Sequence, residues 1–109
     1  MSQDEGFKEL KLDDVRKLID EGGYDIVDVR EDWEWNKGHL PGARHVVLSA
    51  LLSNPAAQHI RDKTSFVCQT GERSSVASEI AVALGSKDIV NFRGGTKAWK
   101  DAGLPVEVP

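Results

Sequence analysis

Hydrophobic positions along the chain fall into short runs that alternate between a helical period and a strand period. A helical spacing of apolar residues covers 12–19, with Asp13 as its expected N-cap and Gly22-Gly23 as its stop. The next run, YDIVDVR at 24–30, is short and β-branched, which is typical of a buried strand. The chain therefore begins its pattern with a helix followed by a strand.

Later runs continue the alternation. The expected helices are a short turn at 31–38, a segment at 48–57 stopped by Pro55, and helices at 75–84 and 95–102, which end at Gly85 and Gly103. The expected strands are 45–48, 65–68 and 89–92. This order predicts an α/β fold with a parallel sheet covered by helices on both faces, in which ligands bind beyond the carboxyl ends of the strands.

Length and composition limit the class of protein. The 109 residues suit one domain spanning 1–109, and 39% hydrophobic with 29% charged residues is an ordinary soluble composition. A net charge of −4 argues against nonspecific nucleic-acid binding, and no run is long enough to cross a bilayer. The acidic start lacks the features of a signal peptide, and one cysteine favours a reducing compartment. We expect a cytoplasmic protein that binds neither nucleic acid nor membrane.

The one cysteine, Cys68, lies in the stretch TSFVCQTGERSSVASEI, between an expected strand and an expected helix. The thiolate is the reactive form of cysteine, and three features favour it here. The loop Gln69 to Arg73 is expected to turn its amides inward, and the helix beginning near Ser74 brings its positive end to the loop. Arg73 adds a permanent cation, while Gly71 gives the loop conformational freedom.

The same loop is expected to hold an anionic substrate. Ser74 and Ser75 can cap the helix or donate hydroxyl hydrogen bonds. No histidine or carboxylate in the segment is placed as an obvious base, so the chemistry needs a nucleophile and anion stabilisation more than proton transfer. Sulfur transfer fits, because a thiolate attacks sulfur directly and the leaving group departs as an anion. The alternative is that Cys68 is only a small buried core residue.

Three segments resemble the rhodanese (thiosulfate sulfurtransferase) family. They are IVDVREDWEWNKGHLPGARHV at 26–46, CQTGERS at 68–74 and FRGGTKAWKDAGLPV at 92–106. The resemblance implies a three-layer domain with a central, mostly parallel five-stranded sheet and helices on both faces. It also implies a persulfide on Cys68, with Arg73 as the closing cation of the loop and Gln69, Thr70, Gly71 and Glu72 as its backbone cradle.

The family further implies thiosulfate as donor and cyanide as acceptor, without a cofactor or a metal. The expected partners are a small-molecule sulfur donor and a thiophilic acceptor, with a sulfur-relay protein or a thioredoxin-like thiol as a further possibility. Two positions depart from the family pattern: Gln69 stands where some members have Arg, and Glu72 adds a negative charge. We therefore expect thiosulfate to be a poor donor, and a thiol or protein persulfide to be a better one.

Two other functions remain open from the residues. Phosphatases and arsenate reductases of this fold separate their Cys and Arg by five residues, whereas four separate Cys68 from Arg73, which suits the outer sulfur of a persulfide better than a whole phosphate. A non-catalytic binding module of the same fold often lacks the cysteine that this chain keeps. Asp28 and Arg30 are expected to brace the neighbouring loop, His39 to bond its own turn, and Arg44 is left unassigned.

Overall fold

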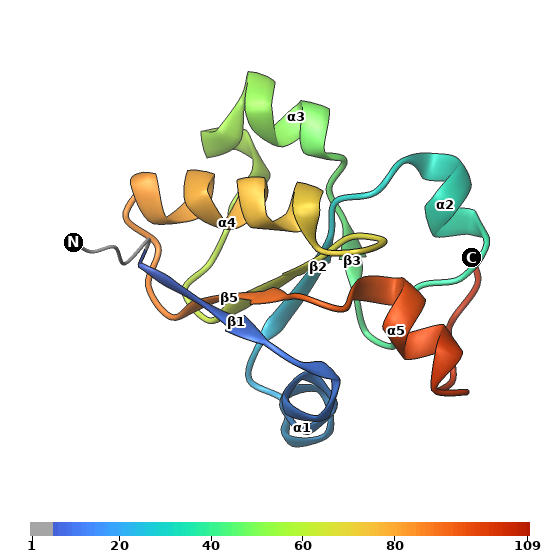
Figure 1. Ribbon diagram of the computed structural model, residues 1–109. Helices are drawn as coiled ribbons and strands as arrows, with labels where there is room; N and C mark the ends of the chain where they lie inside the picture. Colours follow the sequence, from blue (N-terminus) through green and yellow to red (C-terminus); the bar gives the residue numbers. More distant parts are fainter. Residues whose placement is uncertain (1–5) are drawn as a thin grey trace.

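Five short strands form one sheet in the order β1-β5-β4-β2-β3, and each of the four strand pairings found within residues 6–109 is parallel (Figure 1). The structure is a computed structural model that describes residues 6–109, so the expected absence of a signal peptide falls partly outside the described residues. The strands are β1 Phe7–Leu10, β2 Asp25–Asp28, β3 Arg44–His45, β4 Thr64–Val67 and β5 Ile89–Phe92.

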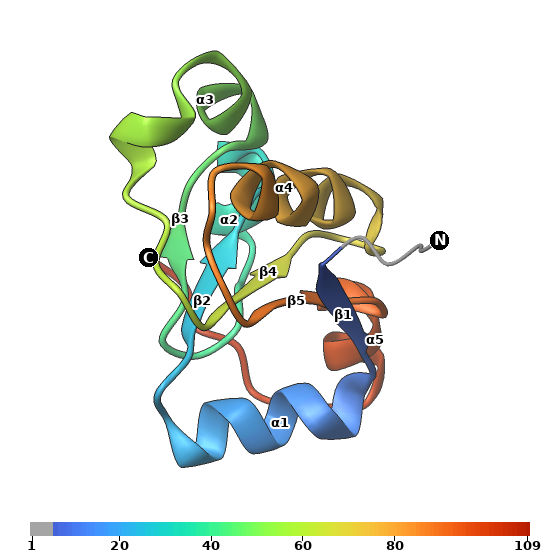
Figure 2. The ribbon, with the colours of Figure 1, turned by 90° about the vertical axis from the view of Figure 1, so that its left-hand side faces the viewer.

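Helices cover both faces of this sheet (Figure 2). They are α1 Leu12–Glu21, α2 Asp32–Asn36, α3 Leu48–Ser53, the 3-10 helix η1 Pro55–Gln58, α4 Glu72–Ala83 and α5 Gly95–Asp101. Helices α3 and α4 lie on one face, and α1 and α5 lie on the other (Figure 1). The expected three-layer α/β fold with a parallel five-stranded sheet is confirmed.

Alternation of side chains along the strands divides the core into two clusters. On the α3/α4 face the buried residues include Val27, Phe66 and Cys68, and on the α1/α5 face they include Ile26 and Val67. Successive side chains of a strand point to opposite faces, so a strand buried on both sides is apolar throughout. This explains why β2, β4 and β5 each contain two adjacent apolar residues that are buried, beside polar residues that are also enclosed.

A buried ion pair stabilises the segment that follows β2. Arg30 is 1% exposed, and its guanidinium donates to both carboxylate oxygens of Asp28 at 2.9–3.0 Å. The same group donates to the carbonyl of Gly38 at 2.9 Å, which ties β2 to the end of α2. The expectation that Asp28 and Arg30 brace the neighbouring loop agrees with these contacts.

Three local predictions differ from the structure. Strand β1 was not predicted, because the two apolar residues of FKEL lie at its ends with two charged residues between them, and the strand lies at the edge of the sheet. Asp13 is not the N-cap of α1: the cap is Lys11, and Asp13 lies in the first turn, where its charge suits the helix dipole. Helix α4 begins at Glu72 instead of near Ser74, because Gly71 adopts φ 103° and serves as its N-cap.

Around β3 the predicted boundaries are also displaced. The strand covers Arg44–His45 instead of 45–48, and α3 starts at Leu48. Pro55 does not stop one continuous helix but begins η1, where its missing N–H costs nothing in the first turn. No helix among residues 6–109 has the length and apolar character that crossing a bilayer requires.

Replacing Arg30 by Met should lower the free energy of unfolding by about 3–5 kcal/mol, because the Asp28 carboxylate would be left buried without its partner. Urea denaturation measures this change, and Arg16→Met at an exposed position of α1 is the control. The double variant Asp28→Asn/Arg30→Met should recover part of the loss. A loss below about 1 kcal/mol in Arg30→Met would show that the pair is dispensable.

Candidate active site

Cys68 directly follows the last residue of β4, and three residues separate it from the start of α4. It therefore lies at the carboxyl end of the central strand of the sheet. Its side chain is only 1% exposed and belongs to the core cluster on the α3/α4 face. Main chain from Gln69 to Gly71 forms the turn above it. This places the thiol where open parallel sheets bind ligands.

Two groups donate hydrogen bonds to the sulfur. The amide of Gly71 lies 3.1 Å from Cys68 Sγ, and the hydroxyl of Ser74 lies 3.3 Å from it. Ser74 is fully buried in the first turn of α4, where no side-chain cap is formed. Its hydroxyl therefore serves the sulfur instead of the helix end, and both contacts favour negative charge on Sγ.

The carbonyls of the loop are bound from outside. The amides of Thr96 and Lys97, in the first turn of α5, donate to the carbonyls of Cys68 at 2.9 Å and Gln69 at 3.1 Å. In a trans peptide the N–H points opposite to the C=O, so these bonds turn the amides of Gln69 and Thr70 away from α5. The N-terminus of α5 therefore fixes the orientation of the loop backbone.

Two glycines permit this close packing. A Cβ on Gly71 would lie 2.4 Å from the carbonyl oxygen of Arg93, and one on Gly95 would lie 2.4 Å from the carbonyl oxygen of Gln69. Both glycines also have positive φ, which other residues rarely adopt. The Gly71 carbonyl accepts in turn from Asn91 Nδ2 at 3.2 Å. The loop is thus enclosed by β5 and α5 on its outer side.

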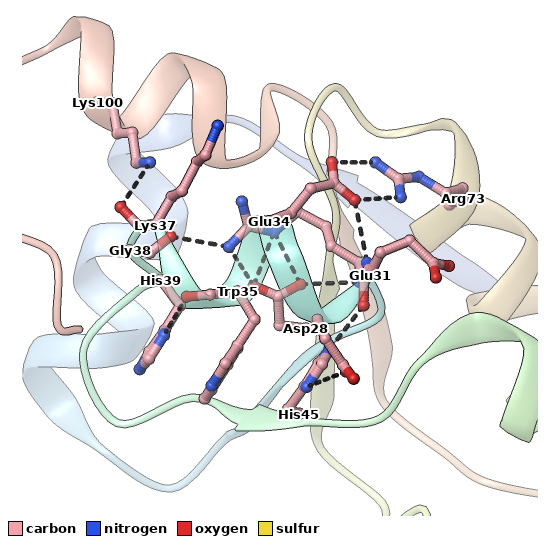
Figure 3. A network of polar contacts seen from close by, with 12 residues as sticks. Asp28, Glu31, Glu34, Trp35, Lys37, Gly38, His39, His45, Arg73 and Lys100 are labelled. Atoms are coloured by element: carbon pink, nitrogen blue, oxygen red, sulfur yellow. Dashed lines mark hydrogen bonds and ion pairs between the residues drawn. The ribbon is translucent and has the colours of Figure 1, made fainter. Parts of the chain in front are cut away.

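Arg73 forms a two-pronged ion pair with Glu34 of α2 (Figure 3). The distances are 2.7 Å from Nη1 to Oε1 and 2.9 Å from Nη2 to Oε2. The Glu34 carboxylate also accepts from the amide of Glu31 at 3.0 Å, and Glu31 caps the same helix in return. Sequence reasoning missed Glu34, because its partner lies 39 positions further along the chain.

The charges of this pair stabilise each other. Hydrogen bonds from Arg73 lower the pKa of the Glu34 carboxyl from 4.5 to about 2, with further help from the Glu31 amide, although burial opposes the shift. Hydrogen bonding to Glu34 raises the pKa of Arg73 further above its usual value. The positive charge near the sulfur is therefore shared with a carboxylate, so Arg73 is not a free cation.

The side chains of Gln69, Thr70 and Glu72 lie on the outer side of the loop. Thr70 is exposed, and its hydroxyl donates a short hydrogen bond to the Glu72 carboxylate. This bond, with a contribution from the amide of Glu72 itself, lowers the pKa of the Glu72 carboxyl. Gln69 is half-buried and lines a hollow between α2 and α5. Among the predicted cradle residues, the Gly71 amide is the one that hydrogen-bonds the sulfur.

Other residues weighed in the sequence lie outside the immediate contacts of the sulfur. Arg44 pairs with Asp25 at 2.9 Å and donates to the carbonyls of Gln58 and His59, toward the amino end of β2. The ring of His39 hydrogen-bonds the carbonyl of Trp35 at 3.2 Å, and this carbonyl belongs to α2 instead of the turn that His39 was expected to bond. Within residues 6–109, no group of three His, Cys, Asp or Glu side chains is placed to hold a metal ion.

Comparisons with known proteins agree with the fold. A family model described as "Rhodanese-like domain" matches residues 11–102. The chain is 28% identical over 92 residues to the putative sulfur carrier protein YrkF of Bacillus subtilis, which covers 84% of this chain and 50% of YrkF. It is 28% identical over 94 residues to the thiosulfate sulfurtransferase GlpE of Pseudomonas aeruginosa, which covers 86% of this chain and 84% of GlpE.

A solved structure gives the same result. A rhodanese-related protein from Thermoplasma volcanium superposes with a TM-score of 0.81 at 29% identity, over 94% of this chain and all of that one. An α/β domain with a cysteine at the end of its central strand, enclosed by a short loop, is thus the class that fold and site define. The chain belongs to the rhodanese-like family, and it spans half the length of YrkF.

Replacing Glu34 by Gln should lower the free energy of unfolding by about 1–3 kcal/mol at neutral pH, because a charged, two-pronged contact is lost. The folded pKa of Glu34 is lowered, so its contribution is present above pH 4.5 and is lost as the pH falls toward about 2. The difference between wild type and Glu34→Gln should therefore shrink below pH 4.5. Urea titrations at several pH values test this, with Asp14→Asn as the control; a difference that grows in acid contradicts it.

Proposed function

We propose that the protein is a sulfurtransferase that carries sulfane sulfur as a persulfide on Cys68. With thiosulfate, the Cys68 thiolate attacks the outer sulfur, the S–S bond of the donor breaks, and sulfite leaves with the electron pair of that bond. A nucleophile such as cyanide or a thiolate then attacks the outer sulfur of the persulfide and regenerates the thiolate. No net oxidation is required, and no cofactor takes part.

The observation that carries this proposal is the pair of donors on the sulfur. The Gly71 amide and the Ser74 hydroxyl both donate to Sγ, and neither can remove a proton from it at neutral pH. No histidine or carboxylate appears among the hydrogen-bond partners of Sγ within residues 6–109. A site that supplies donors but no adjacent base suits a reaction in which anions enter and leave.

The other predicted residues take supporting roles in this mechanism. Arg73, held by Glu34, adds positive potential near the sulfur without being free to follow a substrate. Gln69, Thr70 and Glu72 form the outer rim of the loop, where they meet the donor. The donor is thiosulfate or a thiol or protein persulfide, and the acceptor is a small thiophile, a sulfur-relay protein or a thioredoxin-like thiol.

Loop length favours sulfur transfer over phosphoryl transfer. Four residues separate Cys68 from Arg73, and the Arg73 guanidinium is already engaged with a carboxylate instead of being free to bind an oxyanion. A binding module without catalysis is the second alternative, and the two donors on Sγ argue against it, since inert packing of a thiol needs neither. The relatives YrkF and GlpE, a putative sulfur carrier and a sulfurtransferase, support the proposal.

Intact mass tests the reaction directly. Incubation with thiosulfate should add the mass of one sulfur atom to the wild-type protein, and cyanide should then remove it with release of thiocyanate. Cys68→Ala should gain nothing, and Cys68→Ser is a second control that keeps the volume of the side chain closer to that of the thiol. The proposal is wrong if the wild-type protein gains no sulfur but hydrolyses an aryl phosphate, and if Cys68→Ser loses that hydrolysis. That outcome would identify a phosphatase instead.

The charge of Glu72 should weaken the binding of doubly charged thiosulfate. Glu72→Gln is expected to lower the KM for thiosulfate by roughly two- to fivefold at low salt, because one repulsive charge at the loop is removed. Steady-state kinetics with cyanide as acceptor measure this, and Glu79→Gln on the same helix is the matched control. An unchanged or raised KM would show that the carboxylate does not face the donor.

A further inference from the structure

A small hollow beside the loop is lined by cationic and aromatic side chains from two helices. It measures about 270 Å³ and lies between α2 and α5, with Gln69 of the loop on its wall. Trp33 and Lys37 come from α2 and its end, and Lys100 comes from the last turn of α5. A hollow of this size admits a small molecule, and Gln69 places it next to the residue that bears the thiol.

The two lysines carry the free charge of this hollow. Its other ionic groups are engaged elsewhere, since Arg30 is held by Asp28 and Glu34 is held by Arg73. Neither Lys37 nor Lys100 forms an ion pair with any other residue of the described part of the chain. The hollow therefore offers two uncompensated positive charges, in a chain whose net charge is −4.

The lysines are placed close together by their neighbours. Lys100 Nζ donates to the carbonyl of Lys37 at 3.4 Å, which joins α5 to the end of α2 (Figure 3). Lys37 Nζ lies 5.2 Å from the centre of the Trp33 ring, and that ring is 62% exposed. The ring thus presents an unusually open aromatic face beside the charges, where the carbon chain of a ligand can pack.

The other side of the loop has the opposite charge. A second hollow there is lined by Glu9, Glu72 and Arg93 together with uncharged residues, so two carboxylates face one guanidinium. An anion that approaches Cys68 is therefore repelled on that side and attracted on the side of Lys37 and Lys100. The charge difference between the two hollows therefore favours the approach of an anionic ligand from the side of Lys37 and Lys100.

We propose that Lys37 and Lys100, together with the Trp33 ring, bind the carboxylate of a small thiol or thiol persulfide while its sulfur reaches Cys68. This inference rests on the proposed sulfur transfer and names the substrate class that the site selects. As a donor, the ligand R–S–S⁻ gives its outer sulfur to the Cys68 thiolate and leaves as R–S⁻. As an acceptor, R–S⁻ takes the outer sulfur from the persulfide and leaves the Cys68 thiolate behind.

An ordinary structural role for the lysines makes a different prediction. Cations at helix C-termini interact favourably with the last carbonyls, and Lys100 does contact one. That role alone predicts a loss of thermal stability in charge-reversal variants, with no change in the preference between anionic and neutral ligands. Discrimination between ligands of different charge is therefore the decisive measurement, and the melting temperature is recorded beside it.

The test compares matched pairs of reagents on the same thiol. The first pair is iodoacetate and iodoacetamide, which alkylate Cys68 with and without a carboxylate. The second pair is 3-mercaptopropionate and 2-mercaptoethanol as acceptors from the thiosulfate-loaded protein. The variants are Lys37→Glu/Lys100→Glu and, as a control with the same change in total charge, Lys17→Glu/Lys87→Glu, whose exposed lysines lie on α1 and before β5.

In Lys37→Glu/Lys100→Glu, the anionic-to-neutral rate ratio of both pairs should fall roughly tenfold or more at low salt, and the fall should diminish at high salt. The control should keep both ratios within about twofold of wild type, because its exposed lysines, on α1 and before β5, do not line the hollow beside the loop. Ratios that change equally in both variants, or in neither, overturn the inference.

The alkylation ratio and the sulfur-acceptor ratio also distinguish failure of the proposed carboxylate subsite from failure of the proposed sulfurtransferase function. If Cys68 never gains sulfur but the alkylation ratio falls as expected, the carboxylate subsite stands and the sulfurtransferase proposal fails. If sulfur transfer occurs and neither ratio moves, the subsite fails and the sulfurtransferase proposal stands.

Discussion

The outward hydrogen bonding of the loop carbonyls is the constraint on which the site depends. A peptide group cannot turn its C=O and its N–H to the same side, so a loop that surrounds an anion with amides must find hydrogen-bond donors elsewhere for its carbonyls. Here the first turn of α5 supplies them for Cys68 and Gln69, and Asn91 supplies one for Gly71. The last helix of the chain thus determines how the loop faces the sulfur.

A second layer of contacts joins the loop to the segment after β2. The buried pair of Asp28 and Arg30 holds that segment against the end of α2, and α2 presents Glu34 to Arg73. In the ion pairs Asp28–Arg30 and Glu34–Arg73, each charged side chain is neutralised by its partner. The consequence is a site with little free positive charge in its inner wall and with more exposed cations than carboxylates on the side of Lys37 and Lys100, whereas two carboxylates outnumber Arg93 on the other side.

Much of the fold follows from the sequence because its central strands are apolar on both faces. The runs at 24–30 and 89–92 contain the observed β2 and β5, the run at 65–68 is displaced by one residue from β4, and the thiol lies at the end of a strand as its neighbours suggest. The edge strand β1 was missed, since a strand that is half exposed has no continuous apolar run. Local sequence patterns therefore predict buried central strands well, but they predict exposed edge strands poorly.

The partners of the loop were harder to predict than the loop itself. Gly71 and Ser74 lie close to Cys68 in the chain, so short-range turn chemistry indicates them. Glu34 and Lys100 reach the site only through the packing of α2 and α5, across dozens of residues. The structure shows a capping box between Glu31 and Glu34, which the sequence analysis did not predict, because Glu is not the usual first residue of that pattern.

The almost complete burial of a solitary thiol has a consequence for turnover. Cys68 is the one cysteine among these 109 residues, so under the proposed mechanism no second thiol among them can attack the persulfide to form an internal disulfide. Under that mechanism the sulfur passes to a separate acceptor, which must be narrow enough to reach a residue that is 1% exposed. In that mechanism, the shape of the entrance to Cys68 sets the lifetime of the persulfide.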